Sequence, residues 1–409
     1  MTLSKPEFSN SGDIFSFWWR DEALRARVDR LTERSSGELV GEITIESELS
    51  AESGLLHQSR FTLTSVTSRR TVAKQCHQKV EELDWDALLE QVSVYVLRKR
   101  REGEPLIRVG LQPARAGPVW RLKPLLLENQ ANVLYGAGAS GKSEMAYLIG
   151  LMVQTGMGCC GMDDPIKGEV LFLDFETCWE EADDRIQALK RGMGFDEAAH
   201  LNYRFCHQPL TTDIVEIQRL VLETHAQLVI VDSVGPAMGT DSEKWDVMAL
   251  RYFAALRSLR VTTLSIDHIA KEKSDAPFGS IYKYNIARNI FEVKQVPGEA
   301  ENSISLGLYH RKINSGRLLK PLGFKVLFDD ADKLALFERC DIKAIPELER
   351  GLPLVERIKS LLLTAGAPVL TKDLAEALGT GENTIRVVLS RHKNHFVKLQ
   401  DGWAVRANE

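Results

Sequence analysis

The sequence predicts a protein of three domains. Residues 1–117 form an N-terminal α+β domain, residues 118–340 a central α/β domain with a mainly parallel sheet, and residues 351–409 a C-terminal winged helix-turn-helix domain. Three observations predict this organisation. Short β-rich runs alternate with helical stretches in the middle of the chain, a glycine-rich loop joins a strand to a helix there, and the last segment has the pattern of three helices followed by a hairpin.

Length and composition agree with a multidomain globular protein. The chain has 409 residues, of which 44% are hydrophobic and 27% charged. These values exclude a single small module and a disordered or fibrous protein. The net charge of -5 also excludes a protein that coats nucleic acid through a global cationic field. If the protein binds nucleic acid, its basic groups must be gathered locally.

The cysteines and the hydrophobic pattern predict a soluble cytoplasmic protein. Six cysteines show no C-x-x-C spacing, which favours scattered reduced thiols over a disulfide framework or a zinc site. The start of the chain lacks the basic region and apolar length of a signal peptide. No apolar stretch reaches the length of about 18 residues that a membrane span requires. We therefore expect no membrane association.

The N-terminal domain begins with strand patterns and ends with a helix. Residues 38–47 and 60–68 alternate polar and β-branched side chains, as paired, half-exposed strands do. Residues 80–101 have helical spacing and end in the basic run at 98–101, which we interpret as a solvated helix end, with a nucleic-acid or partner contact as the alternative. Two Pro and two Gly make residues 110–118 a linker. We identify no family resemblance in this domain, so its role stays open.

The central domain alternates strands and helices. The expected strands cover residues 133–135, 170–174, 228–232, 262–267 and 290–293, and the expected helices cover residues 142–155, 179–191, 213–227 and 243–259. Such alternation is typical of an α/β domain with a mainly parallel sheet. Residues 341–353, which contain two more Pro, form the second linker.

The C-terminal domain has the pattern of a winged helix-turn-helix. Helices are expected at residues 354–363, 371–378 with Thr371 as N-cap, and 383–392, followed by a hairpin over residues 396–405. The third helix would occupy the recognition position. Arg386, Arg391 and Lys393 lie on this helix or just after it, so we expect them to contact DNA. Docking of a protein is the alternative role for such a domain.

The glycine-rich loop is the most specific motif in the chain. Residues 136–143 read GAGASGKS and satisfy the Walker A pattern G-x4-G-K-[ST]. Since a strand enters the loop and a helix begins at Lys142, backbone N–H groups and the helix dipole would face a phosphate. Lys142 would reach the β- and γ-phosphates, and Ser143 would bind Mg²⁺. The predicted ATP-binding residues are Gly136, Ala137, Gly138, Ala139, Ser140, Gly141, Lys142 and Ser143.

Polar residues end the other predicted strands of the central sheet. Asp232 ends a hydrophobic strand, and we assign it to the Mg²⁺ shell together with Ser143. Either Asp174 or Glu176 could face the γ-phosphate and polarise the attacking water, or be a solvated strand end. His268 follows a third strand, where a polar group could sense the γ-phosphate, although a lone histidine is more often structural.

The order of these motifs resembles that of the RecA/DnaB-type P-loop ATPases. The nearest subgroup is the RepA-like hexameric replicative helicases of plasmids and phages, and the resemblance covers about residues 119–340. It implies ATP and Mg²⁺ as cofactors. It also implies that Lys142 and Ser143 bind phosphate and metal, that Glu176 is the catalytic base, Asp232 the Walker B acid, and His268 the γ-phosphate sensor.

The same resemblance implies an active site shared between subunits. The neighbouring subunit would contribute basic residues from a late strand, often as Lys-x-Arg. Lys312 fits the lysine, but Asn314 stands where the arginine is expected, so either Arg311 or Arg317 substitutes or the trans contribution is weaker than usual. An arginine finger can be worth several orders of magnitude in rate. The departure therefore puts the intrinsic ATPase rate in doubt.

In this family two channel-facing loops bind single-stranded DNA. They would map to residues 235–245 and 271–284. Lysines would pair with phosphates while tyrosines stack on bases, which suits sequence-independent binding. The expected contacts are Lys271, Lys273, Tyr282 and Lys283. A surface loop without DNA contact is the alternative.

Three functional hypotheses follow from these residues. The first is an ATP-dependent helicase or translocase that acts in replication as a homo-oligomeric ring, most often a hexamer in this family, on single-stranded DNA. It would meet a replication partner through its N-terminal or winged-helix domain. The second is a filament-forming recombination or repair ATPase. The third is a nucleotide-gated regulator whose winged domain binds a DNA site.

Overall fold

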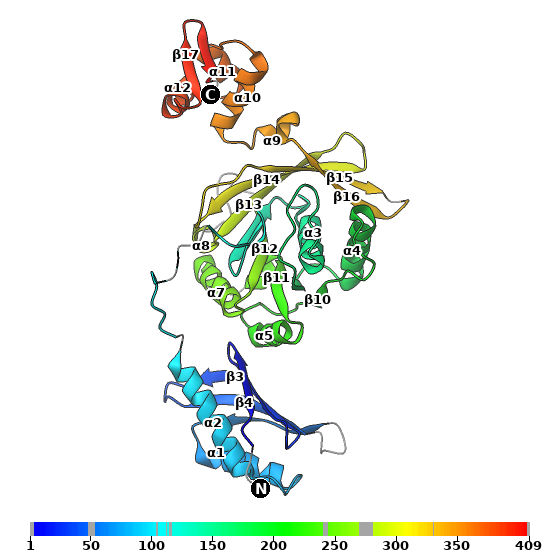
Figure 1. The fold of residues 1–409 in the computed structure, drawn as a ribbon, viewed down its shortest axis with the longest axis vertical. Helices are drawn as coiled ribbons and strands as arrows, with labels where there is room; N and C mark the ends of the chain where they lie inside the picture. Colours follow the sequence, from blue (N-terminus) through cyan, green and yellow to red (C-terminus); the bar gives the residue numbers. More distant parts are fainter. Residues whose placement is uncertain are drawn as a thin grey trace. The chain divides into compact units, whose positions relative to one another are not determined.

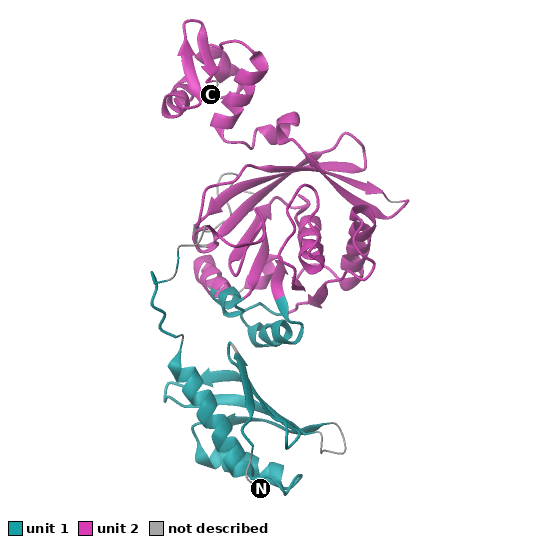
Figure 2. Cartoon of the chain, in the orientation of Figure 1, with its two compact units in different colours: residues 1–116, 208–226, 254–260 teal, residues 117–207, 227–253, 261–409 magenta. Residues whose placement is uncertain are grey.

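The computed structural model describes residues 4–47, 54–103, 105–111, 113, 117–239, 244–269, 281–329 and 331–406, without the side chains of Ser11, Ile281 and Tyr282. Figure 1 shows its elements. The chain forms two compact units (Figure 2). Unit 1 comprises residues 1–116, 208–226 and 254–260, and unit 2 comprises residues 117–207, 227–253 and 261–409. The C-terminal helices are thus grouped with the central sheet, and the division into three domains stays a prediction.

Unit 1 is built on a five-stranded antiparallel sheet in the order β1-β2-β3-β4-β5. Its strands are β1 (Glu7–Ser11), β2 (Ile14–Trp19), β3 (Leu24–Glu33), β4 (Leu39–Ser47) and β5 (Leu55–Thr62). Helices α1 (Val66–His77) and α2 (Trp85–Glu102) cover one face, where Trp19, Leu24 and Val92 join a single buried core. The alternation of side chains across each strand supplies this apolar face.

The structure corrects the expected strand at residues 60–68. Strand β5 ends at Thr62, and α1 begins at Val66 because the Ser65 hydroxyl accepts a 3.3 Å hydrogen bond from the Ser68 amide. A serine in this position is a common N-cap, so β-branched residues after it belong to a helix. The strands β1, β2 and β3 were not expected from the sequence.

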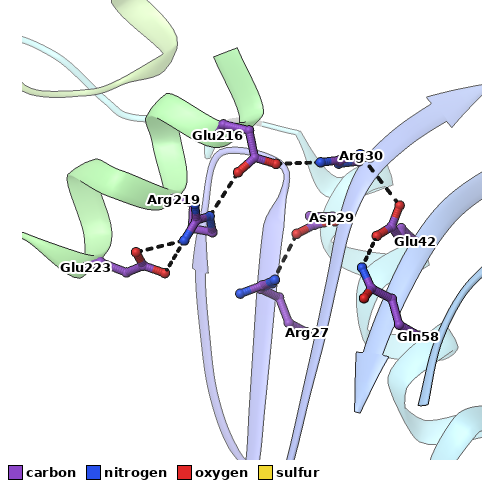
Figure 3. A network of polar contacts seen from close by, with 8 residues as sticks. All are labelled: Arg27, Asp29, Arg30, Glu42, Gln58, Glu216, Arg219 and Glu223. Atoms are coloured by element: carbon purple, nitrogen blue, oxygen red, sulfur yellow. Dashed lines mark hydrogen bonds and ion pairs between the residues drawn. The ribbon is translucent and has the colours of Figure 1, made fainter. Parts of the chain in front are cut away.

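Unit 1 also contains α5 (Ile214–Glu223), which a polar network joins to strand β3 (Figure 3). Arg30 Nη2 lies 2.6 Å from Glu216 Oε1, and Arg219 binds both Glu216 and Glu223. Arg30 also lies 3.8 Å from Glu42, which accepts a hydrogen bond from Gln58. Arg30 is mostly solvent-exposed, so each contact contributes little to stability.

Unit 2 is built on a nine-stranded sheet in the order β10-β9-β11-β12-β8-β13-β14-β15-β16. The strands are β8 (Ala131–Gly136), β9 (Glu169–Asp174), β10 (Asn202–Phe205), β11 (Ala226–Asp232), β12 (Thr262–His268), β13 (Asn289–Pro297), β14 (Ser303–Ile313), β15 (Leu322–Asp329) and β16 (Leu334–Cys340). The pairs β10–β9, β11–β12, β12–β8 and β8–β13 are parallel, and β13 to β16 pair antiparallel. A small ribbon of β6 (Trp120–Leu122) and β7 (Leu126–Leu127) precedes the sheet.

Helices flank the parallel strands (Figure 1). They are α3 (Lys142–Thr155), α4 (Trp179–Met193), α6 (Val234–Met238), α7 (Trp245–Ser258) and α8 (Ile281–Ile286). Buried side chains of α3 pack with Phe172, Ile230 and Phe291 of the strands in one core. Every expected central strand and helix is found; α3 has the expected ends, and the other elements have shifted ends. The antiparallel strands β14, β15 and β16 were not expected.

The chain after the sheet forms short helices and a hairpin. The predicted linker contains η1 (Ile342–Ala344) and α9 (Pro346–Glu349). The elements that follow are α10 (Leu354–Ala365), α11 (Thr371–Ala377), α12 (Glu382–Arg391), β17 (Phe396–Leu399) and β18 (Gly402–Val405), and they share a core around Ile358, Ile385 and Phe396. The order of elements is the one expected, but Thr371 is the first helical residue and Leu370 the N-cap.

The described residues hold neither a membrane-crossing candidate nor a disulfide. Of the helices in the described ranges, none combines the length and apolar character that a bilayer span needs. All six cysteines lie in described residues, and none of them forms a disulfide.

Candidate nucleotide-binding site

The Walker A loop connects β8 to α3 at the carboxyl edge of the sheet. Ala139 and Gly141 have positive φ angles of 53° and 74°, which curl the backbone around the start of α3. The Lys142 side chain is only 3% exposed, and its Nζ donates hydrogen bonds to the Ala137 carbonyl at 2.6 Å and the Ser140 hydroxyl at 3.3 Å. The positive end of a 14-residue helix and a lysine therefore meet at one point, as an anion site requires.

The first glycine of the loop is required by packing. A Cβ on Gly136 would lie 2.4 Å from the Val293 carbonyl oxygen of β13 and 2.9 Å from the Ser140 hydroxyl. By contrast, a Cβ on Gly138 would meet no atom within 4 Å. Gly136 thus allows β8 to approach β13 at the point where the loop begins.

Ser143 and Asp232 fit a divalent cation. The Ser143 side chain hydrogen-bonds to the buried Asp232 carboxylate. Within the described chain, Asp232 Oδ1 is buried and has no hydrogen-bond partner. Burial raises the pKa of Asp232 to about 6, with Glu176 and Asp174 adding repulsion. An unpartnered carboxylate oxygen beside a hydroxyl is a donor set that Mg²⁺ prefers.

Asp174 shapes the turn that follows β9. Its carboxylate accepts hydrogen bonds from the amides of Glu176 at 2.8 Å and Thr177 at 3.0 Å, and from the hydroxyls of Thr177 at 2.5 Å and Tyr203 at 3.1 Å. The residue is buried, so these bonds use the whole carboxylate. Of the two acids left open by the sequence, Asp174 is therefore structural.

Glu176 projects from this turn toward the ends of β11 and β12. Its Oε1 accepts a short hydrogen bond from the Ser233 hydroxyl and lies 3.4 Å from His268 Nε2. The hydrogen bond from His268, and then the one from Ser233, lower the pKa of Glu176 to about 2. Glu176 therefore stays ionised and partly exposed, beside the sensor candidate and near Lys142.

Two of the three basic residues expected to act in trans, Lys312 and Arg317, lie toward the opposite edge of the sheet. Ile313, at the end of β14, pairs with Asn289, which pairs with Asn132 near the start of β8. From there to Gly136 the strand rises about 13 Å. Lys312 and the loop that carries Arg317 therefore lie toward the far edge from the Walker A loop of the same chain, whereas Arg311, opposite the bulge at Ile290 and Phe291, lies nearer the middle of the sheet.

Two of the three trans candidates already have partners. Arg311 binds the Glu292 carboxylate and donates a 3.2 Å hydrogen bond to the Gly351 carbonyl. Lys312 Nζ donates to the backbone carbonyls of residues 284, 285 and 287 at 2.6 to 2.8 Å, and so caps the end of α8. Arg317 is exposed, and its side chain contacts no acid or other hydrogen-bond partner in the described ranges.

The residues expected to contact DNA differ in their placement. Lys271 and Lys273 lie outside the described residues, as does the side chain of Tyr282. Lys283 is buried in an ion pair with Asp267, and this position does not suit contact with a DNA strand. Arg391 at the end of α12 and Lys393 just after it are exposed, and Arg386 of α12 is exposed with Glu382 at 2.8 Å.

Some residues of the site were not expected from the sequence. Ser233 binds Glu176, and Thr177 and Tyr203 bind Asp174. Ser233 directly follows Asp232, so its position beside the site was the one available signal. Tyr203 lies on a different strand, and nothing in its local sequence points to the site.

Comparisons with known proteins match the central region of the chain. A family model described as an AAA domain matches residues 106–274, which include the Walker A loop, Glu176, Asp232 and His268. No curated protein matches the sequence. Among solved structures, a KaiC-like protein from the archaeon Pyrococcus horikoshii OT3 is similar at 16% identity, over 55% of this chain and 99% of that one, with a TM-score of 0.38.

The strand order, the loop and the family match agree with one another. Strand β12, which carries His268, lies between β8, which leads into the Walker A loop, and β11, which ends in Asp232. Lys142, Ser143, Asp232 and Glu176 all face the carboxyl edge that these strands form. The central sheet and its helices therefore have the arrangement of a P-loop nucleotide-binding domain, which agrees with the match of residues 106–274 to an AAA domain.

Proposed function

We propose that the protein is an ATP-dependent helicase or translocase that moves along single-stranded DNA during replication as a ring of identical subunits. The ring would be a hexamer, as the resemblance to RepA-like helicases implies. ATP with Mg²⁺ would bind at the carboxyl edge of the central sheet, and hydrolysis would drive the movement.

The hydrolytic roles follow from the positions of the side chains. Lys142 would leave its contacts with Ala137 and Ser140 to neutralise phosphate charge. Ser143 and Asp232 would hold Mg²⁺, which supplies charge neutralisation between the β- and γ-phosphates. Glu176 would orient the attacking water and take its proton, and His268, at 3.4 Å from Glu176, would respond to the γ-phosphate.

One observation carries the ring proposal: the only exposed trans candidate among the described residues, Arg317, lies at the edge opposite the Walker A loop of its own chain. A basic group at that edge can reach a phosphate only in another copy. Contacts between opposite edges are head-to-tail, and such contacts close into rings when the rotation permits. This supports an ATP site completed by a neighbour.

Mixing two inactive variants tests the shared site. Arg317→Ala removes the trans group, and Asp232→Ala removes the cis metal ligand. In an equal mixture, about a quarter of junctions would pair an intact Walker site with an intact Arg317. ATPase activity should therefore return in the mixture. If the two variants stay inactive together, the trans role of Arg317 is wrong.

Electron microscopy with an ATP analogue and forked DNA tests the assembly. Closed rings, together with unwinding of the fork, would support the proposal. Filaments with strand exchange would support the recombination ATPase instead, and monomers without unwinding would contradict both.

A second candidate is a nucleotide-gated regulator, and the C-terminal elements favour it. We propose that α10, α11, α12 and the β17–β18 hairpin form a winged helix-turn-helix, with exposed Arg391 and Lys393 placed for phosphate contacts. Sequence-specific duplex binding without unwinding would favour this function. Replacing Arg391 and Lys393 by alanine should then abolish duplex binding but leave ATP hydrolysis unchanged.

A further inference from the structure

A buried ion pair lies next to the nucleotide sensor. Lys283 Nζ of α8 lies 3.1 Å from Asp267 Oδ2 and 3.3 Å from Oδ1, and the two side chains are 6% and 5% exposed. Burying two charges is expensive, so the pair needs close geometry to persist. Asp267 directly precedes His268, and its Oδ1 also accepts a 3.0 Å hydrogen bond from the His268 amide. One carboxylate therefore holds both α8 and the backbone of the sensor.

The contacts continue on both sides of this pair. Toward the site, His268 Nε2 lies 3.4 Å from Glu176. Away from it, Lys283 Nζ lies 5.7 Å from the ring centre of Trp245, at the start of α7. A buried 2.8 Å hydrogen bond between the Tyr252 and Ser265 hydroxyls attaches the same helix to β12. Groups at the catalytic carboxylate, β12, α8 and the start of α7 thus form one contiguous set.

We propose that Asp267 and Lys283 are positioning residues that link occupancy of the nucleotide site to the position of α8 and α7. The inference rests on the proposed function, because these two helices adjoin the segments expected to contact the strand. A γ-phosphate that displaces His268 moves the backbone next to Asp267, and the ion pair passes that displacement to α8. The affinity for single-stranded DNA then depends on the nucleotide.

This role differs from the phosphate contact expected of Lys283 from the sequence. To reach a phosphate, Lys283 would have to leave Asp267 buried and unpaired, and breaking a buried pair on one side is strongly destabilising. Among the residues around the ion pair, Trp245 is better suited to contact single-stranded DNA, since a base can stack on its exposed aromatic ring.

The test compares the affinity for a labelled single-stranded oligonucleotide in a non-hydrolysable ATP analogue and in ADP, measured by fluorescence anisotropy on the full chain. The wild-type protein should show a ratio of about 5- to 150-fold between the two states. The double variant Asp267→Leu with Lys283→Met replaces the pair by apolar side chains, a change that is often neutral for stability. Its ratio should fall to within about twofold of unity, with nucleotide affinity unchanged. Lys283→Arg, which keeps the charge, should retain the ratio.

A second ion pair of the same domain, with a buried arginine and a partly buried glutamate, provides the control. Arg121 Nη2 lies 2.7 Å from Glu128 Oε1, and this pair does not contact the sensor. The variant Arg121→Met with Glu128→Leu should change stability but retain the wild-type ratio.

Two results would overturn the inference while leaving the helicase proposal intact. One is a wild-type ratio in the Asp267–Lys283 double variant. The other is an Lys283→Ala variant that binds the strand more weakly by the same factor in both nucleotides, with a salt slope reduced by about one, because that pattern marks a direct phosphate contact. A wild-type protein that binds no single strand in either nucleotide would overturn the proposed function and the inference together.

Discussion

The two edges of the central sheet use their charged side chains in different ways. Three charged residues lie near one another at the carboxyl edge: Lys142, Asp232 and Glu176. Each has a charged group that remains able to bind a phosphate, a metal ion or the attacking water. Toward the opposite edge, Lys312 is already held by backbone carbonyls, and Arg311, nearer the middle of the sheet, is held by Glu292. Charge alone therefore does not mark a functional residue, and the partners of each charge distinguish a reactive group from a structural one.

The largest effect is expected from Glu176→Gln at the carboxyl edge. The amide cannot accept a proton from water, so kcat should fall by about 10²- to 10⁴-fold, while the dissociation constant of ATP stays the same. Steady-state hydrolysis and equilibrium binding of a fluorescent ATP analogue measure the two quantities. Glu180→Gln, an exposed neighbour in α4, is the control and should keep the wild-type rate. Wild-type turnover in Glu176→Gln would remove this residue from its role.

Arg311→Ala tests the basic residues away from the carboxyl edge. The substitution leaves the largely buried Glu292 carboxylate with only the more exposed Lys294 at 3.7 Å and frees the Gly351 carbonyl, so the free energy of unfolding should fall by about 1 to 3 kcal/mol. Denaturant unfolding measures this change, and the kcat of the folded variant should stay within about twofold of wild type. A large loss of kcat at unchanged stability would instead assign Arg311 to the trans site.

A smaller effect is expected from Tyr203→Phe. The variant keeps the ring that stacks on Phe172 but loses the hydrogen bond to Asp174, which is worth about 0.5 to 1.5 kcal/mol. Because Asp174 shapes the turn that carries Glu176, kcat should fall by roughly two- to tenfold with little change in KM. An equal loss in nucleotide affinity would show that the turn supports binding and not catalysis.

The smallest effect is expected from Arg30→Ala, away from both edges. In the Arg30–Glu216 pair of unit 1 the arginine side chain is 56% exposed and the glutamate 27%, and such surface pairs contribute roughly 0.2 to 1 kcal/mol, which salt reduces. Thermal unfolding at low and high salt should show a small difference that disappears at high salt. A larger, salt-independent loss would mean that Arg30 supports the packing of unit 1.

The sequence predicts which residues lie at the carboxyl edge, because a local pattern of a hydrophobic run followed by a polar residue marks each strand end there. Hydrophobic runs that end in Asp174, Asp232 and His268 identify both the strands and their polar ends. The Walker A loop also has its expected strand and helix. What the sequence leaves open is which acid is free, and only the bonds from Tyr203 and Thr177 to Asp174 decide this.

Other features depend on contacts between distant residues. A lysine such as Lys283 is a residue type that often contacts DNA phosphates, but Lys283 is buried in an ion pair with Asp267 of another element. Helix α1 begins after the N-cap Ser65, although the β-branched residues around it favour a strand in the sequence. Strands β14, β15 and β16 are ordered by pairing with β13 and with one another, so no local signal fixes them as an extension of the parallel sheet.

Gly136 and Gly138 of the Walker A loop differ in the space around them. We therefore expect them to differ in how far they vary among related sequences. Because the Val293 carbonyl leaves no room for a Cβ at Gly136, any other residue there would force β8 and β13 apart, whether or not a nucleotide is bound. Gly138 has open space, so its replacement by alanine should preserve the fold. In a family of homologues, position 136 would therefore stay glycine even in members that have lost the ability to hydrolyse ATP, whereas position 138 would drift.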